Sequence, residues 1–171
     1  SIGMIFKNEI RCIERCLKSL QPLREAIPCE LVMADTGATD GSREVAEQYA
    51  DILFDFPWVN DFSAARNAVM ERCSGIWYMS IDCDEWVDPD IEGYVTFLTA
   101  RERFQEFNFA SVIIRNYNTA ELAAGGGYAD FLAVRLLRLS TGIRYEGNIH
   151  EHWPYGSDLR TMLIRGGVFH H

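Results

Sequence analysis

The stretch IWYMSIDCDEWVDPD, residues 76–90, places an apolar run directly before five carboxylates. Asp82 and Asp84 are two residues apart, so in an extended segment both side chains leave the same face and can share a partner. Two such carboxylates repel each other unless a proton or a cation lies between them. Carboxylate oxygens suit Mg²⁺ or Mn²⁺, which commonly complete their coordination shells with phosphate oxygens. The pair therefore predicts a divalent metal that carries a phosphorylated small molecule.

Other acidic residues near turns have different expected roles. Glu85, Asp88 and Asp90 are expected to form a solvated loop and the start of a helix, where acidic groups are favourable. Asp40, in DTGATDG, is expected to cap the following helix. Asp35 comes directly after an apolar run, where its carboxylate can accept a hydrogen bond from a nucleobase N–H or a ribose hydroxyl.

The elements that must position these residues can be read from hydrophobic spacing. Apolar runs at 2–6, 30–34, 52–56 and 76–81 alternate with segments of helical spacing at about 10–20, 43–50 and 61–73. This order predicts a parallel sheet with right-handed crossovers and helices on both faces. Ligands bind beyond the carboxyl ends of the strands in such sheets. We therefore expect Lys7, Asp35, Asp82 and Asp84 to meet at one edge.

The second half of the chain is less regular. Its pattern predicts a helix over 90–105 and strands at 109–117, 131–139 and 160–169. The segment 118–130 joins the first two of these strands, and 142–153 reads as a loop. Together the two halves predict one α/β domain with a mixed C-terminal part.

Composition limits the classes of partner. A net charge of −9 over 171 residues argues against nucleic acid or an anionic membrane as a general partner. No apolar run approaches the roughly 20 residues of a membrane span, and no signal peptide is visible. The five cysteines have no metal-site spacing and are expected to be reduced thiols in a cytoplasmic protein. The chain lacks an initiator Met and ends within an apolar run, so we expect it to be part of a longer protein.

Four stretches, MIFKNE, ADTGATDGS, DFSAARNAV and YMSIDCDEWVDPD, occur in the order and spacing typical of family 2 glycosyltransferases. The chain resembles that family, and RLLRLSTGIRYEGNIHEHW is similar to a bacterial subgroup with lipopolysaccharide-core glucosyltransferase-like proteins and peptide S-glycosyltransferases. The resemblance implies the GT-A nucleotide-diphospho-sugar transferase fold, with a Rossmann-like, mostly parallel sheet. It also implies that residues 1–90 bind a nucleotide sugar and that 91–171 form the acceptor side.

The resemblance further implies a donor site, whose positions here are Phe6, Lys7, Asn8, Asp35, Arg66, Asn67, Asp82 and Cys83. Asp35 would contact the uracil or ribose of a UDP-sugar, next to the backbone near Phe6 and Lys7. Arg66 matches a basic position near the donor, with Asn67 as its partner in the motif. Asp82 would face the ribose or the sugar.

Metal binding follows from the same resemblance. Asp84, with Asp82 beside it, would bind Mn²⁺ or Mg²⁺. A histidine late in the fold often supplies a further contact in this family, which here would be His150, His170 or His171. His150 fits the IHE pattern of the subgroup. A histidine ligand would favour Mn²⁺.

The reaction that the resemblance implies is transfer of a sugar with inversion, which needs a base to deprotonate the acceptor. Glu151, in NIHEHW, is the first candidate for this base, and Asp130 is the second. The acceptor could be a saccharide, a lipid-linked glycan or a peptide side chain, and a lipid-linked acceptor would bring the protein to a membrane surface. The donor sugar stays open.

Two other classes of function compete with this interpretation. A sugar-nucleotide pyrophosphorylase has a similar α/β layout but needs a glycine-rich, basic loop after the first strand, and FKNEIRCIE has no glycine. A non-catalytic nucleotide-binding or scaffold domain would use the acidic cluster only for structure.

Overall fold

The computed structural model describes residues 1–100, 102–117, 127–154, 156 and 159–171. Its centre is a nine-stranded sheet in the order β3-β2-β1-β4-β7-β6-β9-β5, with β8 paired to β6. The predicted parallel part is confirmed, because the first four strands pair in parallel. These strands are β1 (Ile2–Phe6), β2 (Leu31–Asp35), β3 (Ile52–Asp55) and β4 (Trp77–Ser80).

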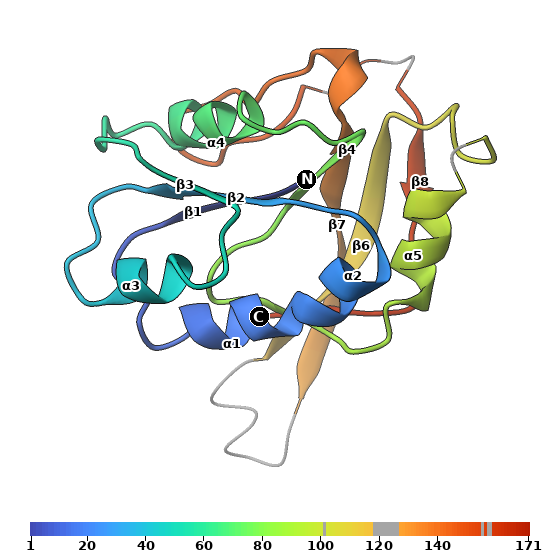
Figure 1. Ribbon diagram of the computed structural model, residues 1–171. Coiled ribbons are helices and arrows are strands. Elements are labelled where there is room, and N and C mark those ends of the chain that lie inside the picture. Colours follow the sequence, from blue (N-terminus) through green and yellow to red (C-terminus); the bar gives the residue numbers. More distant parts are fainter. Residues whose placement is uncertain (101, 118–126, 155, 157–158) are drawn as a thin grey trace.

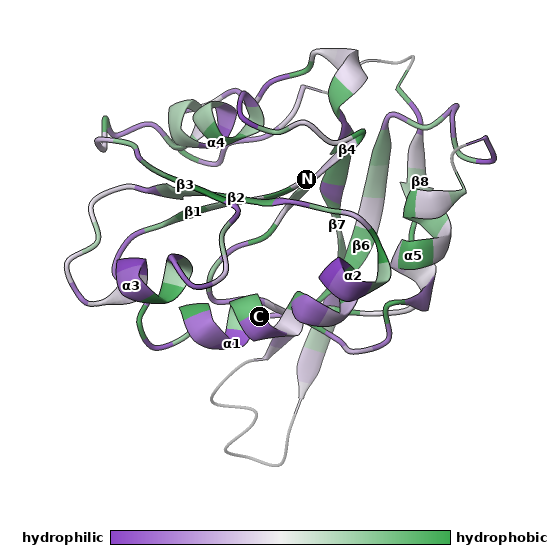
Figure 2. Ribbon diagram, viewed as in Figure 1, coloured by the Kyte–Doolittle hydropathy of each residue, from purple (hydrophilic) through white to green (hydrophobic). Residues whose placement is uncertain are grey.

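Helices cover both faces of this parallel part (Figure 1). One face carries α1 (Ile13–Ser19), α2 (Gln21–Ala26) and α3 (Ser42–Ala46), and the other carries α4 (Phe62–Met70). The core accordingly has two clusters. Ile13 and Leu17 of α1 pack with Met4 of β1, whereas Val69 of α4 packs with Tyr78 of β4. Figure 2 shows both hydrophobic and hydrophilic residues on α1 and α3, as expected for helices that bury one side.

The second half of the chain extends the same sheet with antiparallel and parallel strands. Two long strands form a hairpin: β7 pairs antiparallel with β4 and β6, and β6 also pairs in parallel with β8 and β9. The elements are β5 (Trp86–Val87), α5 (Glu92–Thr99), β6 (Phe109–Tyr117), β7 (Tyr128–Arg138), β8 (Thr161–Leu163) and β9 (Phe169–His170). Among the residues described, no helix is long and apolar enough to span a bilayer.

Several boundaries differ from those predicted. The single strand expected over 160–169 is two short strands, β8 and β9, which are separated by two glycines with positive φ, Gly166 and Gly167. The strand β7 begins at Tyr128, inside the segment expected to be a loop, of which 118–126 lie outside the described residues. The helix α5 is shorter than its pattern, and α2 and β5 carry too few residues to give a periodic signal.

Gly3 sits where β1 passes the ring of Tyr78, and the packing there leaves no room for a side chain. A Cβ at this position would lie 2.2 Å from Cε2 of Tyr78, a side chain that is fully buried. Gly3→Ala is expected to destabilise the fold by about 1–3 kcal/mol, because the tyrosine must leave its rotamer or the strands must separate. Urea unfolding measures this. Gly156→Ala is the matched control, since its Cβ meets only ordinary contacts with Leu159 at 3.8 Å.

Candidate active site

The carboxyl ends of β1, β2 and β4 open into a cavity of about 650 Å³, which we call the main cavity. Its wall comes from both halves of the chain, because the hairpin strands β6 and β7 close its far side. The lining residues are Ile5, Phe6, Lys7, Glu9, Thr36, Trp58, Phe62, Arg66, Asp82, Cys83, Asp84, Glu85, Ile114, Asn116, Phe131, Arg135 and His171.

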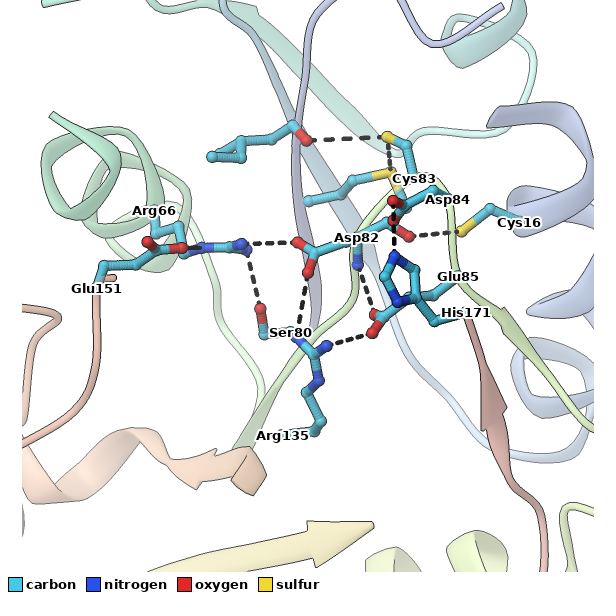
Figure 3. Close-up of polar contacts among 12 residues, drawn as sticks. Cys16, Arg66, Ser80, Asp82, Cys83, Asp84, Glu85, Arg135, Glu151 and His171 are labelled. Carbon is cyan, nitrogen blue, oxygen red and sulfur yellow. Dashed lines mark hydrogen bonds and ion pairs between the residues drawn. The ribbon is translucent and has the colours of Figure 1, made fainter. Parts of the chain in front are cut away.

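Asp82 lies between two arginines at the centre of this wall (Figure 3). Arg66 Nη2 donates to Asp82 Oδ1 at 2.6 Å, and Arg135 Nη1 lies 3.4 Å from Oδ2. Burial alone would raise the pKa of Asp82, but the two guanidinium groups outweigh burial and lower it to about 2. The carboxylate therefore stays ionised at neutral pH and already has cationic partners.

Arg66 reaches the site from α4, whose N-terminus is fixed by Asp61, the N-cap residue that accepts from the Ala64 backbone N–H at 2.9 Å. The guanidinium is buried and donates hydrogen bonds to three side chains at once. Besides Asp82, it donates from Nε to Glu151 Oε1 at 2.6 Å and from Nη1 to Ser80 Oγ at 3.0 Å. Arg66 thus joins the end of β4 to the loop that carries Glu151.

Glu85 does not face solvent as expected; it is only 2% exposed. A turn after β4 brings its carboxylate back to accept from the Asp82 backbone N–H at 3.0 Å, and Arg135 Nη2 pairs with its other oxygen. Burial raises the pKa of Glu85, while Arg135 opposes that rise. Glu151, Arg66, Asp82, Arg135 and Glu85 together form a chain of alternating charges, which we call the charge network.

The histidine beside Asp84 is His171, whose Nε2 lies 3.1 Å from Asp84 Oδ2. Both side chains are about half exposed in the main cavity, at 47% and 53%. A carboxylate oxygen and an imidazole nitrogen this close are a donor set that fits Mn²⁺ better than Mg²⁺, because Mg²⁺ prefers oxygen ligands alone. Among the described residues no group of three or more His, Cys, Asp or Glu side chains could hold a metal ion. A metal here would therefore take further ligands from a diphosphate and water.

The other two candidate histidines lie elsewhere, which corrects their expected part in metal binding. Alternation along β9 turns His170 away from the main cavity. On that other face its Nδ1 lies 2.7 Å from the Tyr117 hydroxyl, and its ring stacks on Trp86. His150 is exposed with a φ of +58°, and the structure does not bring it to Asp84.

Asp35 ends β2 but does not line the main cavity. Its Oδ1 accepts from the backbone N–H groups of Gly37 and Ala38 at 2.9 and 2.7 Å, and Oδ2 accepts from Arg43 at 3.0 Å. Burial would raise its pKa, but these donors outweigh burial and lower it. Its carboxylate thus fixes the turn that places Thr36 in the cavity wall.

The two asparagines of the expected donor site also hold backbone segments. Asn8, with a φ of +56°, accepts from the Thr39 backbone N–H at 2.7 Å. Asn67 makes two hydrogen bonds with the backbone of Tyr145, at 3.0 and 2.8 Å. Neither residue lines the main cavity, whereas Phe6, Lys7 and Cys83 do.

Asp130, the second candidate base, lies on the wrong face of the hairpin. Arg115 holds its carboxylate with two hydrogen bonds of 2.9 Å. The neighbouring residues Ile114 and Phe131 line the cavity, so strand alternation points Arg115 and Asp130 to the opposite face. The structure therefore does not place Asp130 where it could act on a bound acceptor.

Glu151 lies in a second, smaller cavity of about 200 Å³, which shares Arg66, Asp82 and Arg135 with the main cavity. Its other lining residues are Ser80, Val134, Tyr145, His152 and Trp153. The carboxylate of Glu151 is thus held on the far side of Arg66 from the main cavity.

Sequence reasoning missed Arg135 and Glu85 as parts of the site, and it named His171 only as one of three candidate histidines. Arg135 is one of two arginines, with Arg138, inside the mostly apolar run FLAVRLLRL, and a charge in such a run could have signalled a buried ionic partner. Glu85 and His171 carry no such signal, because their positions depend on the turn after β4 and on the register of β9.

Comparisons with known proteins agree with this architecture. The sequence model of the family described as glycosyl transferase family 2 matches residues 1–104. The glycosyltransferase SunS of Bacillus subtilis is 27% identical over 98% of this chain, and the chain spans 38% of that protein. The lipopolysaccharide core biosynthesis glycosyltransferase LpsC of Rhizobium meliloti is 31% identical over 58% of the chain, which covers 37% of LpsC.

Solved structures give the same fold. Staphylococcus aureus TarS, in complex with UDP, matches 69% of this chain and 36% of its own with a TM-score of 0.53 and 18% identity. Glucosyl-3-phosphoglycerate synthase from Mycobacterium tuberculosis, in complex with Mn²⁺ and UDP-glucose, matches 67% of this chain and 43% of its own with a TM-score of 0.54 and 20% identity. The fold is GT-A, and the chain belongs to glycosyl transferase family 2.

Proposed function

We propose that this glycosyltransferase moves a sugar from a UDP-sugar to an acceptor with inversion, using Mn²⁺ or Mg²⁺. The observation that carries the proposal is the pairing of Asp84 with His171 in the same cavity wall as Asp82 and its two arginines. The UDP bound to TarS supports the choice of donor, and the Mn²⁺ and UDP-glucose bound to the synthase support the choice of donor and metal.

The donor diphosphate would occupy the main cavity next to Asp84 and His171. When bound there, the metal would stabilise the negative charge that grows on the leaving diphosphate. Lys7 and Arg135 add cationic groups to the same wall. Asp82, whose oxygens already meet two arginines, would accept from hydroxyls of the donor, and the arginines keep it ionised for that purpose.

Glu151 is the proposed base. It would take a proton from the acceptor as the acceptor oxygen or sulfur attacks the anomeric carbon. Its support is its place across Arg66 and Asp82 from the main cavity. With the donor diphosphate next to Asp84 and His171, that place would be on the side away from the leaving group. Inversion requires attack from that side.

In this proposal the two halves of the chain have different roles. Residues 1–90 would hold most of the donor, while 91–171 would supply the base and the acceptor side, together with Arg135 and His171. The acceptor would be a saccharide, a lipid-linked glycan or a peptide. Five free cysteines are typical of a reducing compartment, which supports a cytoplasmic site of action, at a membrane surface if the acceptor is lipid-linked.

Thermal unfolding with UDP tests the donor and metal parts of this proposal. At 100 times the Kd, UDP with Mn²⁺ is expected to raise the Tm by roughly 5–10 °C. Asp84→Ala should remove the part of this shift that depends on Mn²⁺, because it deletes one of the two metal contacts.

Asp88→Ala is the matched control, since Asp88 is a nearby aspartate that follows β5 and pairs with His170 outside the main cavity. The control should keep the full shift. An absence of any shift with every nucleoside diphosphate would instead support a non-catalytic scaffold.

A further inference from the structure

Three aromatic rings lie side by side on the face of β9 that points away from the main cavity. They belong to Trp86 of β5, Tyr117 of β6 and His170 of β9, and we call them the aromatic cluster. Their planes lie within 12° of one another, with ring centroids 5.0–6.0 Å apart. The Tyr117 hydroxyl is 2.7 Å from Nδ1 of His170, whereas Asp88 Oδ2 is 3.6 Å from Nε2, too far for a hydrogen bond. Tyr117 is therefore the residue that fixes the His170 ring.

The aromatic cluster reaches, directly or through Arg15, the backbone of both members of the Asp84–His171 pair. The backbone N–H of Tyr117 donates to the carbonyl oxygen of His171 at 3.0 Å. At the other end, the guanidinium of Arg15 covers the ring of Trp86 at 3.7 Å and donates to the carbonyl oxygen of Asp84 at 3.3 Å. Trp86 also pairs across the strands with the residue that precedes His171. The cluster thus connects the backbone on each side of the pair.

The register of β9 decides which histidine faces the main cavity. This strand has two residues, and it pairs with two residues on each of its neighbours, β5 and β6. A slip of one residue would turn His170 into the cavity and His171 out of it. Phe169 resists such a slip at the start of the strand, because it is fully buried against the ring of Tyr94. The aromatic cluster resists it at the other end, next to His171.

We propose that Tyr117 is a positioning residue for the metal. By fixing the His170 ring, it holds His171 in place beside Asp84. The inference rests on the proposed function, because a metal ion is what Asp84 and His171 would share. The side chain of Tyr117 leaves the opposite face of the sheet from Asn116, which lines the main cavity, so it can act on the metal only through His171. Its effect is to reduce the freedom that His171 must lose when a metal binds.

Titration of the native chain with Mn²⁺, with and without UDP, tests this proposal, and the electron paramagnetic resonance signal of free Mn²⁺ reports the binding. Tyr117→Phe deletes the hydroxyl that holds His170 but keeps the ring. It is expected to weaken Mn²⁺ binding by about threefold to tenfold, the effect of one lost hydrogen bond behind a metal ligand. The affinity for UDP without metal should stay native, since the variant changes no residue that lines the main cavity.

A double-mutant cycle with His171→Ala separates positioning from a general loss of stability. His171→Ala removes the imidazole and leaves Asp84 in place. In that background the further change Tyr117→Phe should alter Mn²⁺ affinity by no more than about twofold, because the residue that Tyr117 positions is absent. A positioning role thus predicts that the effects of the two changes are not additive.

Tyr128→Phe is the matched control. Tyr128 lies on the same face of the hairpin as Tyr117, with its ring 6.2 Å from that of Tyr117 and the guanidinium of Arg115 over it at 3.9 Å. The substitution removes the same kind of hydroxyl from the same face, and it should leave Mn²⁺ affinity at the native value.

Equal Mn²⁺ affinity in Tyr117→Phe and the native chain would overturn the inference. A loss of the same size in the His171→Ala background would also overturn it, since Tyr117 would then act by another route. Failure of the proposed function is seen separately, because a native chain that binds Mn²⁺ but not UDP would contradict the donor and leave the inference intact. A native chain that binds no Mn²⁺, with or without UDP, would overturn both.

Discussion

Replacing Arg66 by methionine is expected to lower the free energy of unfolding by about 3–5 kcal/mol. The side chain is 8% exposed and donates to Asp82 and Glu151 at 2.6 Å each. Methionine fills part of the space but leaves two carboxylates without their shared cation, and an uncompensated buried charge is costlier than the loss of a contact. Urea unfolding at pH 7 measures the change.

The same variant has a distinct pH dependence. In the native chain the pKa of Asp82 is lowered to about 2, below its usual value. A lowered carboxyl pKa contributes stability that is present above about pH 4 and is lost as the pH falls towards 2. Arg66→Met loses the part of this contribution that Arg66 supplies, while Arg135 still pairs with Asp82. The difference in the free energy of unfolding between the variant and the native chain should therefore shrink as the pH falls over that interval. If the difference in the free energy of unfolding does not change with pH, the loss of stability in Arg66→Met comes from lost packing and not from lost charge pairing.

Arg72→Met is the control for this experiment. Arg72 lies just beyond α4, is exposed, and covers the ring of Phe54 at 3.9 Å. Its removal is expected to cost no more than about 1 kcal/mol. The contrast tests whether the charge network, rather than arginine content near α4, supports the fold.

Glu151→Gln is expected to lower the rate of sugar transfer by about 10²–10⁴-fold while donor binding persists. Glutamine retains an oxygen that can accept from Arg66 Nε, so the loop should stay in place, but the amide cannot take the acceptor proton. Transfer rates at saturating donor, together with the UDP-induced shift in Tm, separate the two effects.

Glu146→Gln is the comparison for that variant, because Glu146 is an exposed glutamate near the start of the same loop. It should retain native transfer rates. Turnover of Glu151→Gln within threefold of the native chain would assign the base to another residue. A loss of both transfer and UDP binding would instead indicate that the change disturbed the charge network.

The parallel half of the fold was predictable because its signals are local. Apolar runs such as 31–35 and 77–80 are bounded by turn residues, and the helical spacing between them leaves one topology for a parallel sheet. The C-terminal half was less predictable, since β8 and β9 are too short to show a period. Their pairing with β6 depends on contacts that are distant in the sequence.

The sequence predicts which residues lie at the strand ends that form the site, but it does not predict which side chains those residues contact. The position of Asp82 and Asp84 at the cavity follows from the end of β4 alone. Asp35 has the same position on β2, yet its turn uses both of its oxygens, which residue type does not reveal. The sequence left His150, His170 and His171 all open as the neighbour of Asp84, because a shift of one residue in β9 would have presented His170 instead of His171.

The separation of Asp84 and His171 by 87 positions has a consequence for the order of folding. The strands β1 to β4 are complete by Ser80, so the parallel half can assemble early as the chain leaves the ribosome. The strand β9 must then dock between β6 and β5, which closes a long loop and is an entropically late step. A nascent chain therefore has its parallel sheet before it can bring Asp84 and His171 together.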